Sequence, residues 1–328
     1  MDNIPVPAPT MWRPLGFGEI FDRAITLYFK NFLRFISIAL VLAVPLGIFQ
    51  YFVDTFQAGP NSFWAQMQHL GTTPATPAPT LPPIFHSPGA LAALIFAFLI
   101  AVFVIALAQM FVYNAAAVGV ARLYAGKAVE FRACYLTVLR RWLPVLGTLV
   151  MIVLIFWAWI IATVICGAIF FVPAVQLASS APGATALLGF LGFLVIVSAV
   201  GVAIVLSAAT NFALYAVVIE DVGVMQGFSS GFARAFSRRD FWRAMGLVIC
   251  SGLIAGIGVT MISGVAQVAL YYNQAWLAAM LTGIAQLLVI PFSVILLAVF
   301  YYDIRIRREG LDLQTSVERL VADDASPT

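Results

Sequence analysis

Six long apolar stretches dominate the chain, and shorter segments that hold nearly all of its charged residues separate them. A helix needs about 20 residues to cross the roughly 30 Å hydrocarbon core of a bilayer, because it rises about 1.5 Å per residue. All six stretches reach this length, and no charged side chain lies well inside any of them. They therefore predict six transmembrane helices, at residues 32–53, 89–121, 143–172, 184–219, 244–272 and 275–302.

Three of the intervening segments repeat apolar residues with the three-to-four-residue spacing of an amphipathic helix. The apolar positions run from Phe17 to Phe32, from Phe131 to Trp142 and from Met225 to Phe236, and the opposite faces carry charged residues or serine. Helices of this kind lie in the headgroup plane of a membrane, with the apolar face toward the acyl chains. The pattern predicts three cytoplasmic-side interfacial helices.

The predicted elements form a unit of one interfacial helix and two spans, which occurs three times. An offset of 97 residues between the second and third units aligns Asn114 with Asn211 and Gly126 with Gly223. Each glycine opens a turn into an interfacial helix, where a positive φ is often needed. The fold class expected is an all-α polytopic membrane protein with a degenerate threefold repeat.

The chain is expected to form one six-span membrane domain over residues 12–310. Residues 1–11 are predicted to be disordered, and residues 311–328 form a short cytoplasmic tail. Residues 54–88 form a Pro-rich extracytoplasmic loop whose sequence GTTPATPAPTLPP favours extended conformations. The first apolar stretch is long and has no cleavage site, so it is expected to be a retained anchor.

Composition and charge fix the environment and the orientation. Hydrophobic residues make up 63% of the chain and charged residues only 9%, whereas soluble domains carry about 25% charged residues. All 17 basic residues lie in the alternate segments that share one side of the membrane with both termini. The excess of Lys and Arg in cytoplasmic segments therefore predicts that both termini are cytoplasmic. The abundance of Arg, Ala and Gly indicates a bacterial source and hence the inner membrane.

Polar side chains within the predicted spans are candidates for a polar path or ligand site at bilayer depth. The alternative is hydrogen bonding between helices, worth about 0.6 kcal/mol each. The residues concerned are Gln109, Asn114, Thr210, Asn211, Gln267 and Gln286.

Basic residues on the interfacial helices are candidates for contacts with anionic lipid headgroups, each worth about 1 kcal/mol near the surface. The alternative is that they only set the topology. They are Arg23, Lys30, Arg140, Arg141, Arg234, Arg238 and Arg239. In the fifth span, Gly252, Gly256 and Gly264 form a stripe of small residues, which favours close helix packing within the bundle or between two copies.

No catalytic, metal or cofactor site is predicted. Glu220 and Asp221 form an acidic pair on the cytoplasmic side, and we expect them to pair with arginine or to cap the next helix. No histidine lies on that side, because His69 and His86 share the Pro-rich loop. The three cysteines form no CxxC pair, so neither a disulfide framework nor a zinc site is indicated. The small net charge of +3 argues against nucleic-acid binding.

Three segments carry a resemblance to a known family. They are RPLGFGEIFDRAITLYFKNF at 13–32, FARAFSRRDFW at 232–242 and YYDIRIRREGLDL at 301–313. They resemble bacterial membrane proteins of the glycerophosphoryl diester phosphodiesterase membrane-domain family, over about residues 12–315. In that family a soluble catalytic barrel sometimes follows the membrane region. The His-Arg-Gly motif of that barrel is missing from this sequence, so the resemblance implies a stand-alone membrane module and transfers no catalytic residue.

These observations favour a non-enzymatic integral membrane protein that organises lipids or supports a partner protein at the inner leaflet. Its expected partners are membrane lipids, anionic headgroups among them, and a second copy or another membrane protein. The first alternative is a small-molecule or lipid transporter in which Asn114 and Asn211 face one cavity. The second is a membrane-embedded enzyme that uses Glu220 and Asp221.

Overall fold

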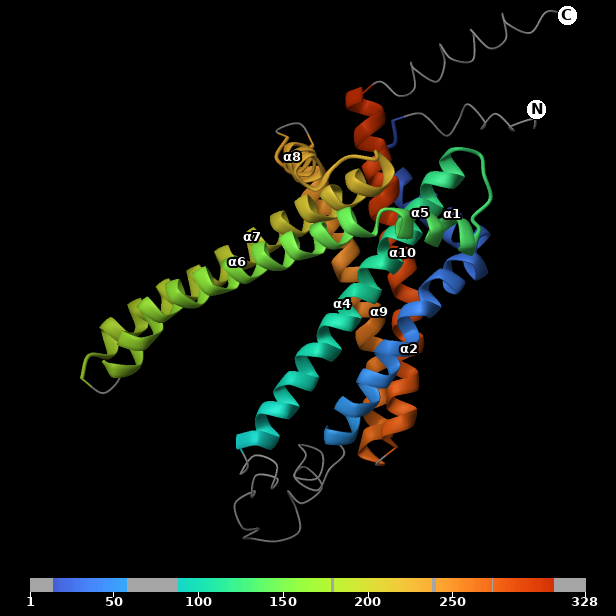
Figure 1. The fold of residues 1–328 in the computed structure, drawn as a ribbon. Coiled ribbons are helices and arrows are strands. Elements are labelled where there is room, and N and C mark those ends of the chain that lie inside the picture. The colour runs from blue at the N-terminus through green and yellow to red at the C-terminus, as the bar shows by residue number, and fades with distance from the viewer. Residues whose placement is uncertain (1–13, 58–87, 178–179, 238–239, 273, 310–328) are drawn as a thin grey trace, which may run out of the picture. The chain divides into compact units, whose positions relative to one another are not determined.

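The computed structural model describes residues 14–57, 88–177, 180–237, 240–272 and 274–309, and every regular element in these ranges is an α-helix (Figure 1). Three helices are short: α1 (Phe17–Lys30), α5 (Phe131–Arg140) and α8 (Val224–Ala235). The six long helices are α2 (Phe32–Gln57), α4 (Pro88–Tyr124), α6 (Trp142–Gln176), α7 (Pro182–Ile219), α9 (Phe241–Tyr271) and α10 (Ala275–Glu309).

All six long helices are long and apolar enough to cross a membrane, and they coincide with the six predicted spans. The prediction of an all-α multi-pass membrane protein is thus confirmed. Most of the helices extend beyond the apolar stretches that predicted them. The largest extension is in α10, which continues to Glu309 and carries Asp303 and three arginines past the apolar core. Asp303 and Arg307 are one helical turn apart and form an ion pair, which supports this extension.

The described helices divide into two compact units. The first unit contains Leu15–Val138 and Ser251–Val299, and the second contains Leu139–Cys250 and Phe300–Thr328. The predicted disordered residues 1–11, the tail 311–328 and residues 58–87 of the Pro-rich loop lie outside the described part of the chain.

In the first unit, α1 is attached to α10 through Tyr28. The Tyr28 hydroxyl donates a 2.8 Å hydrogen bond to the backbone oxygen of Leu288, and the ring lies 5.8 Å from that of Phe292. Pro291 lies within this part of α10 and has no N–H to donate to the preceding turn. The carbonyl that Pro291 leaves without a donor is that of Leu287, and the Tyr28 hydroxyl bonds to the neighbouring carbonyl of Leu288.

The other short helix of the first unit is held in a similar way. The Tyr135 hydroxyl of α5 donates a 2.8 Å hydrogen bond to the backbone oxygen of Ile38 in α2. Between α4 and α5, Arg122 donates to the Ala128 oxygen at 2.9 Å, and Gly126 has a φ of 71°. The expectation of a positive φ at Gly126 is confirmed.

In the second unit, α6 and α7 run side by side as a long helical hairpin (Figure 1). Gly192 of α7 makes room for the Phe171 ring of α6, because a Cβ there would lie 2.7 Å from two ring carbons. The Thr185 hydroxyl of α7 also donates to the backbone oxygen of Ala174 in α6 at 3.3 Å. Small residues thus allow the close approach that stabilises helix pairs in lipid.

The short helix α8 packs directly on the backbone of α7. A Cβ on Gly231 would lie 2.5 Å from the Ala213 nitrogen, and one on Gly227 would lie 2.4 Å from a Val217 methyl carbon. The apolar stripe, which is predicted to face the acyl chains, is divided: Met225 and Phe236 are exposed, but Phe228 is buried.

The turn before α8 also differs from the prediction. Gly223 has a φ of −71° and is the N-cap residue of α8, so the expectation of a positive φ at this position is wrong. Asp221 has a φ of 63° and makes the turn instead. Aspartate tolerates the left-handed region better than most residues, because its side chain can form local hydrogen bonds.

Candidate functional site

The second unit contains a cluster of ion pairs built around Glu220, which follows the last residue of α7. Arg234 of α8 places its Nη1 atom 2.8 Å from Glu220 Oε1 and 2.8 Å from the Tyr301 hydroxyl oxygen. The Tyr301 hydroxyl donates to the same Glu220 oxygen. Arg305, one turn further along α10, approaches Glu220 Oε1 to 3.4 Å. One carboxylate therefore joins the ends of α7, α8 and α10.

The aromatic surroundings of Arg234 strengthen this attachment. The Arg234 guanidinium carbon lies 5.1 Å from the centroid of the Tyr301 ring, within the range of a cation–π interaction. The Tyr215 ring meets the Tyr301 ring edge-on at 5.6 Å. Arg234 is only 8% exposed. The paired carboxylate and the aromatic face together offset the cost of burying this charge.

A second group of ion pairs joins α9 to the same end of α10. Asp303 is 1% exposed and lies 3.0 Å from Arg307 Nε and 3.4 Å from Arg243 Nη2. Asp240, also buried, lies 3.5 Å from Arg308 Nε. Both of these buried carboxylates therefore have guanidinium partners, as buried charges require.

The acidic pair Glu220–Asp221 is engaged by arginine, as expected from the sequence. Arg141, just before α6, forms an ion pair with Asp221 and donates to the Val217 oxygen at 2.8 Å. No group of three His, Cys, Asp or Glu that could hold a metal occurs among the described residues. The geometry of this cluster serves to attach short and long helices to one another.

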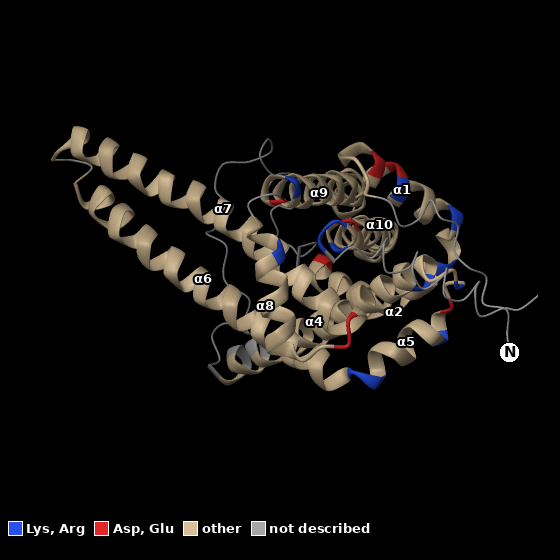
Figure 2. Ribbon diagram, turned by 90° about the horizontal axis from the view of Figure 1, so that it is seen from above, with Lys and Arg blue, Asp and Glu red and all other residues tan. Residues whose placement is uncertain are grey.

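The first unit presents a different set of basic residues. Lys30, Arg34, Lys127 and Arg132 are exposed, and none forms an ion pair with a described acid. Figure 2 shows the Lys and Arg residues of α1 and α5 in blue, whereas α6 and α7 are tan along their length. These four cations are available to anions outside the protein.

The predicted headgroup contacts fall into both sets. Lys30 and Arg140 are exposed, and Arg23 is half-buried. Arg141 and Arg234 are held in ion pairs, which leaves Arg234 little surface for a headgroup. The other two predicted contacts, at positions 238 and 239, lie outside the described residues.

The predicted polar residues of the spans are divided between the units. The Asn114 and Asn211 amides each donate to the backbone oxygen four residues earlier, at 2.9 Å and 2.7 Å. Thr210 donates to the Leu206 oxygen at 2.8 Å. Asn114 is fully buried, and its Oδ1 atom has no hydrogen-bond partner among the described residues.

The remaining three polar residues lie in the first unit. Gln109 is exposed and approaches the Tyr113 hydroxyl at 3.4 Å, whereas Gln267 and Gln286 are half-buried. Four of the six residues belong to the first unit, while Thr210 and Asn211 belong to the second.

The glycine stripe of α9 does not pack closely on described residues of the bundle, and its packing between two copies stays a prediction. A Cβ on Gly252, Gly256 or Gly264 would meet no atom within 4 Å among the described residues. The glycine of this helix that packs closely is Gly258, where a Cβ would lie 3.0 Å from a Val289 methyl carbon of α10. The three glycines of the stripe therefore have no close neighbour among the described residues.

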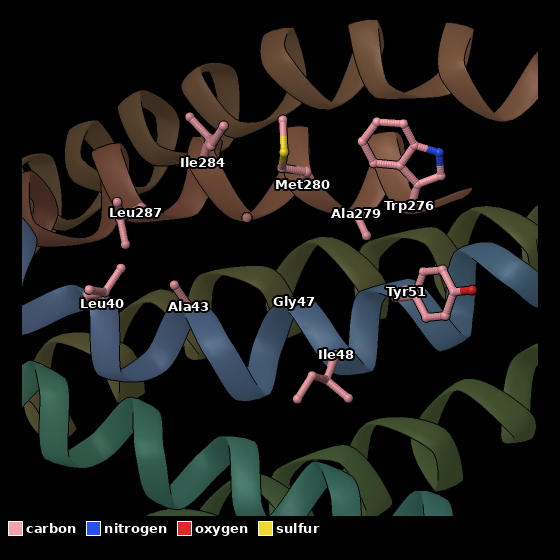
Figure 3. A pocket seen from close by; sticks show the side chains of 11 residues that line it. Leu40, Ala43, Gly47, Ile48, Tyr51, Trp276, Ala279, Met280, Ile284 and Leu287 are labelled. Atoms are coloured by element: carbon pink, nitrogen blue, oxygen red, sulfur yellow. The ribbon is translucent and has the colours of Figure 1, made fainter. Parts of the chain in front are cut away.

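Two apolar grooves border the first half of α10 in the first unit. One, of about 450 Å³, lies between α2 and α10 (Figure 3). The other, of about 470 Å³, lies between α9 and α10. The first is lined by Leu40, Ala43, Gly47, Ile48, Tyr51, Trp276, Ala279, Met280, Gly283, Ile284 and Leu287. The second is lined by Met261, Gly264, Val265, Val268, Ala269, Tyr272, Gln274, Leu277 and Leu281.

No family model, curated protein or solved structure matches the chain.

The structure brings together several residues whose roles the sequence pattern does not predict. Tyr301 and Asp303 belong to the family-like segment at 301–313, and both bind arginines in the cluster. Gly227 and Gly231 were not noted, although their four-residue spacing is a known signal for close helix packing. That spacing would have identified the packing face of α8.

Proposed function

We propose that this chain is a non-enzymatic, multi-pass protein of the bacterial inner membrane that binds anionic phospholipid headgroups at the cytoplasmic surface. The observation that carries the proposal is the set of exposed basic residues without acidic partners in the first unit: Lys30, Arg34, Lys127 and Arg132. The second unit contrasts with it, because six of its arginines are paired with carboxylates.

Exposed apolar side chains lie beside these basic residues. Phe29 is 69% exposed and Leu33 is 78% exposed, and they flank Lys30 and Arg34 in the sequence. Phe131, next to Arg132, is 46% exposed. Apolar side chains adjoining basic ones are typical of helices at the headgroup boundary, where the apolar groups enter the acyl region. Four such charges would contribute about 4 kcal/mol to binding of an anionic surface, at about 1 kcal/mol each.

The charge distribution supports a cytoplasmic location for this surface, with both termini on the same side. The proposal includes α1, α5 and α8 as interfacial helices of a threefold repeat. The matching i−4 hydrogen bonds of Asn114 and Asn211 support that repeat. We also propose membership of the glycerophosphoryl diester phosphodiesterase membrane-domain family, on the three resembling segments.

Lipid selectivity of the full chain tests this function. The chain is reconstituted in equimolar phosphatidylglycerol and phosphatidylethanolamine and extracted in mild detergent, and the retained lipids are quantified by mass spectrometry. Wild type should retain phosphatidylglycerol in excess. The combined variant Lys30→Gln, Arg34→Gln, Lys127→Gln and Arg132→Gln should lose this preference. Salt at about 1 M should also reduce it, because the Debye length falls to about 3 Å.

The matched control exchanges each of these residues for the other basic residue: K30R, R34K, K127R and R132K. It keeps every charge and should keep the preference for phosphatidylglycerol. Reporters fused after positions 76 and 310 verify that neither variant inverts in the membrane. Equal selectivity in the neutralised and charge-conserving variants would refute headgroup binding by these residues.

A second candidate function is transport of a small molecule or lipid, and Asn114 is the observation that favours it. A buried amide oxygen without a partner costs about 1–3 kcal/mol, and polar groups inside spans often mark pathways. Asn114→Leu should then raise the melting temperature while abolishing thermal stabilisation by the transported solute, screened among amino acids, sugars and nucleosides. A lower melting temperature would instead assign the amide to helix packing.

A further inference from the structure

We propose that the first unit binds one diacyl lipid whose two acyl chains occupy the grooves on either side of α10. The grooves have nearly equal volumes, about 450 and 470 Å³. Both fall in the range of roughly 300–1,000 Å³ that is typical of small-molecule pockets. Both lie on helices that are apolar enough to be surrounded by lipid. This inference goes beyond headgroup binding by basic residues, because it concerns the membrane-embedded surface.

The length of the grooves matches one leaflet of a bilayer. The first groove extends along α2 from Leu40 to Tyr51, and the second extends along α9 from Met261 to its end. At about 1.5 Å per residue, these segments are about 15–16 Å long. Half of a hydrocarbon core of about 30 Å is about 15 Å. Each groove is therefore about as long as one acyl chain that spans one leaflet.

The side chains along the grooves fit an acyl chain. In the first groove, the only side chains with polar atoms are Tyr51 and Trp276, and Figure 3 shows both at one end, with Leu40 and Leu287 at the other. The second groove has its polar side chains, Tyr272 and Gln274, beside the start of α10. Tyrosine and tryptophan prefer the level of the headgroups. Each groove therefore has polar side chains at one end and mainly apolar side chains along the rest of its length.

A hydrogen bond joins the polar ends of the two grooves. Trp276 of the first groove donates from Nε1 to the Oε1 atom of Gln274, which lines the second groove, at 2.9 Å. The two grooves therefore begin side by side at the start of α10. A lipid whose two chains leave one glycerol backbone matches this arrangement.

The grooves stay open because their glycines have no neighbours. A Cβ on Gly47 or Gly283 in the first groove, or on Gly264 in the second, would meet no atom within 4 Å among the described residues. A transmembrane helix of a second copy would fill far more space. A helix segment about 16 Å long and about 10 Å wide occupies roughly 1,300 Å³ as a cylinder. Grooves of this size accommodate single acyl chains better than a helix.

The test measures lipid retained by the full chain. The protein is reconstituted in vesicles of phosphatidylethanolamine and its single-chain lyso form, then extracted in mild detergent and analysed by native mass spectrometry. Wild type should retain the diacyl lipid in preference to the lyso lipid. This comparison needs no variant, so it does not depend on the folding of a mutant. Equal retention of the two lipids would overturn the proposal.

Substitutions locate the lipid. Gly47→Leu fills the first groove and Gly264→Leu fills the second. Each should reduce retained diacyl lipid about fivefold, which corresponds to about 1 kcal/mol. Gly256→Leu is the matched control for Gly264→Leu, because it lies two turns earlier on α9, outside the grooves, and also meets no atom within 4 Å. It should retain lipid as wild type does.

Two outcomes of this experiment would contradict the proposal. One is equal lipid retention in the Gly264→Leu and Gly256→Leu variants. The other is a wild-type dimer without bound lipid that Gly47→Leu converts to monomers, which would make the groove an interface between two copies. Failure of the headgroup proposal is distinguishable, because it would appear as lost phosphatidylglycerol selectivity with the diacyl lipid still retained.

Discussion

Glu220, which ends α7, and Arg234, on α8, form an ion pair of 2.8 Å in which both side chains are largely buried. Tyr301 hydrogen-bonds to both members of the pair, and Arg305 lies 3.4 Å from the same Glu220 oxygen. Two guanidinium groups therefore share one carboxylate. Removing one member of a buried pair is much more costly than removing an exposed pair, because the remaining charge is left uncompensated.

Glu220→Gln should lower the free energy of unfolding of the protein by about 3–5 kcal/mol, because Arg234 and Arg305 lose their shared countercharge. Denaturant or thermal unfolding in detergent measures this change. Asp221→Asn is the control, since the Asp221 side chain is 75% exposed and exposed ion pairs contribute only about 0–1 kcal/mol. Equal losses for the two variants would show that Glu220 does not hold the cluster together.

Gly231→Ala should destabilise the contact between α8 and α7, because the added Cβ would lie 2.5 Å from the Ala213 nitrogen. Overpacking of this kind costs about 1–3 kcal/mol, and the melting temperature should fall. Gly201→Ala in α7 is the control, since its Cβ would meet no atom within 4 Å. Alanine is favoured over glycine in a helix by about 1 kcal/mol, so the control should be neutral or stabilising. A neutral Gly231→Ala variant would argue against the close contact.

Tyr28→Phe and Tyr135→Phe should each lower stability by about 1 kcal/mol, because each removes a hydrogen bond from a short helix to a span. Hydrogen exchange of α1 and α5 should also become faster. Tyr272→Phe, at an exposed residue, serves as the control and should change neither property.

The free energy of unfolding should fall at alkaline pH, because ionisable side chains of α1 and α5 are buried in the folded protein. Burial raises the pKa of the Cys134 thiol above its ordinary value of 9.0, although the Arg122 guanidinium acts in the opposite direction. Burial also raises the pKa of Tyr28 and Tyr135. Folding favours the neutral forms of these groups, so their contribution is complete below pH 9.0 and decreases above it.

The matching measurement is the free energy of unfolding as a function of pH. Cys134→Ala should reduce the alkaline slope, because one of the buried groups that must ionise is removed. Cys166→Ala, at an exposed residue of α6, should leave the slope unchanged. If both variants keep the wild-type slope, Cys134 does not contribute to the alkaline sensitivity.

The number and position of the long helices were predictable from the sequence, because an apolar run of this length has no other stable environment than lipid. The packing face of α8 was not predictable by the same reasoning. The apolar stripe is predicted to face the acyl chains, and lipid is as apolar as phenylalanine, so burying such a side chain against another helix gains little. Phe236 therefore remains exposed while Gly231 packs against α7.

The role of the basic residues was predictable only in part. A count of Lys and Arg along the chain cannot separate exposed residues from paired ones. Arg234 is buried because Glu220 and Tyr301 bind its guanidinium, and Tyr301 lies on a helix far along the sequence. The same limit applies to α9, where Gly258 packs and the regular stripe around Gly256 does not. In both helices the outcome depends on a partner element that periodicity does not reveal.

The contact of α8 with α7 has a mechanical consequence. At Gly231 the main chain of α8 lies against the main chain of α7, and at Gly227 it lies against the Val217 side chain, so the short helix has little room to slide. A lipid or protein that pulls on α8 would therefore move the end of α7 and Glu220 together with it. A force applied to the short helix would reach the end of a long helix through these close contacts and the ion pair of Arg234 with Glu220.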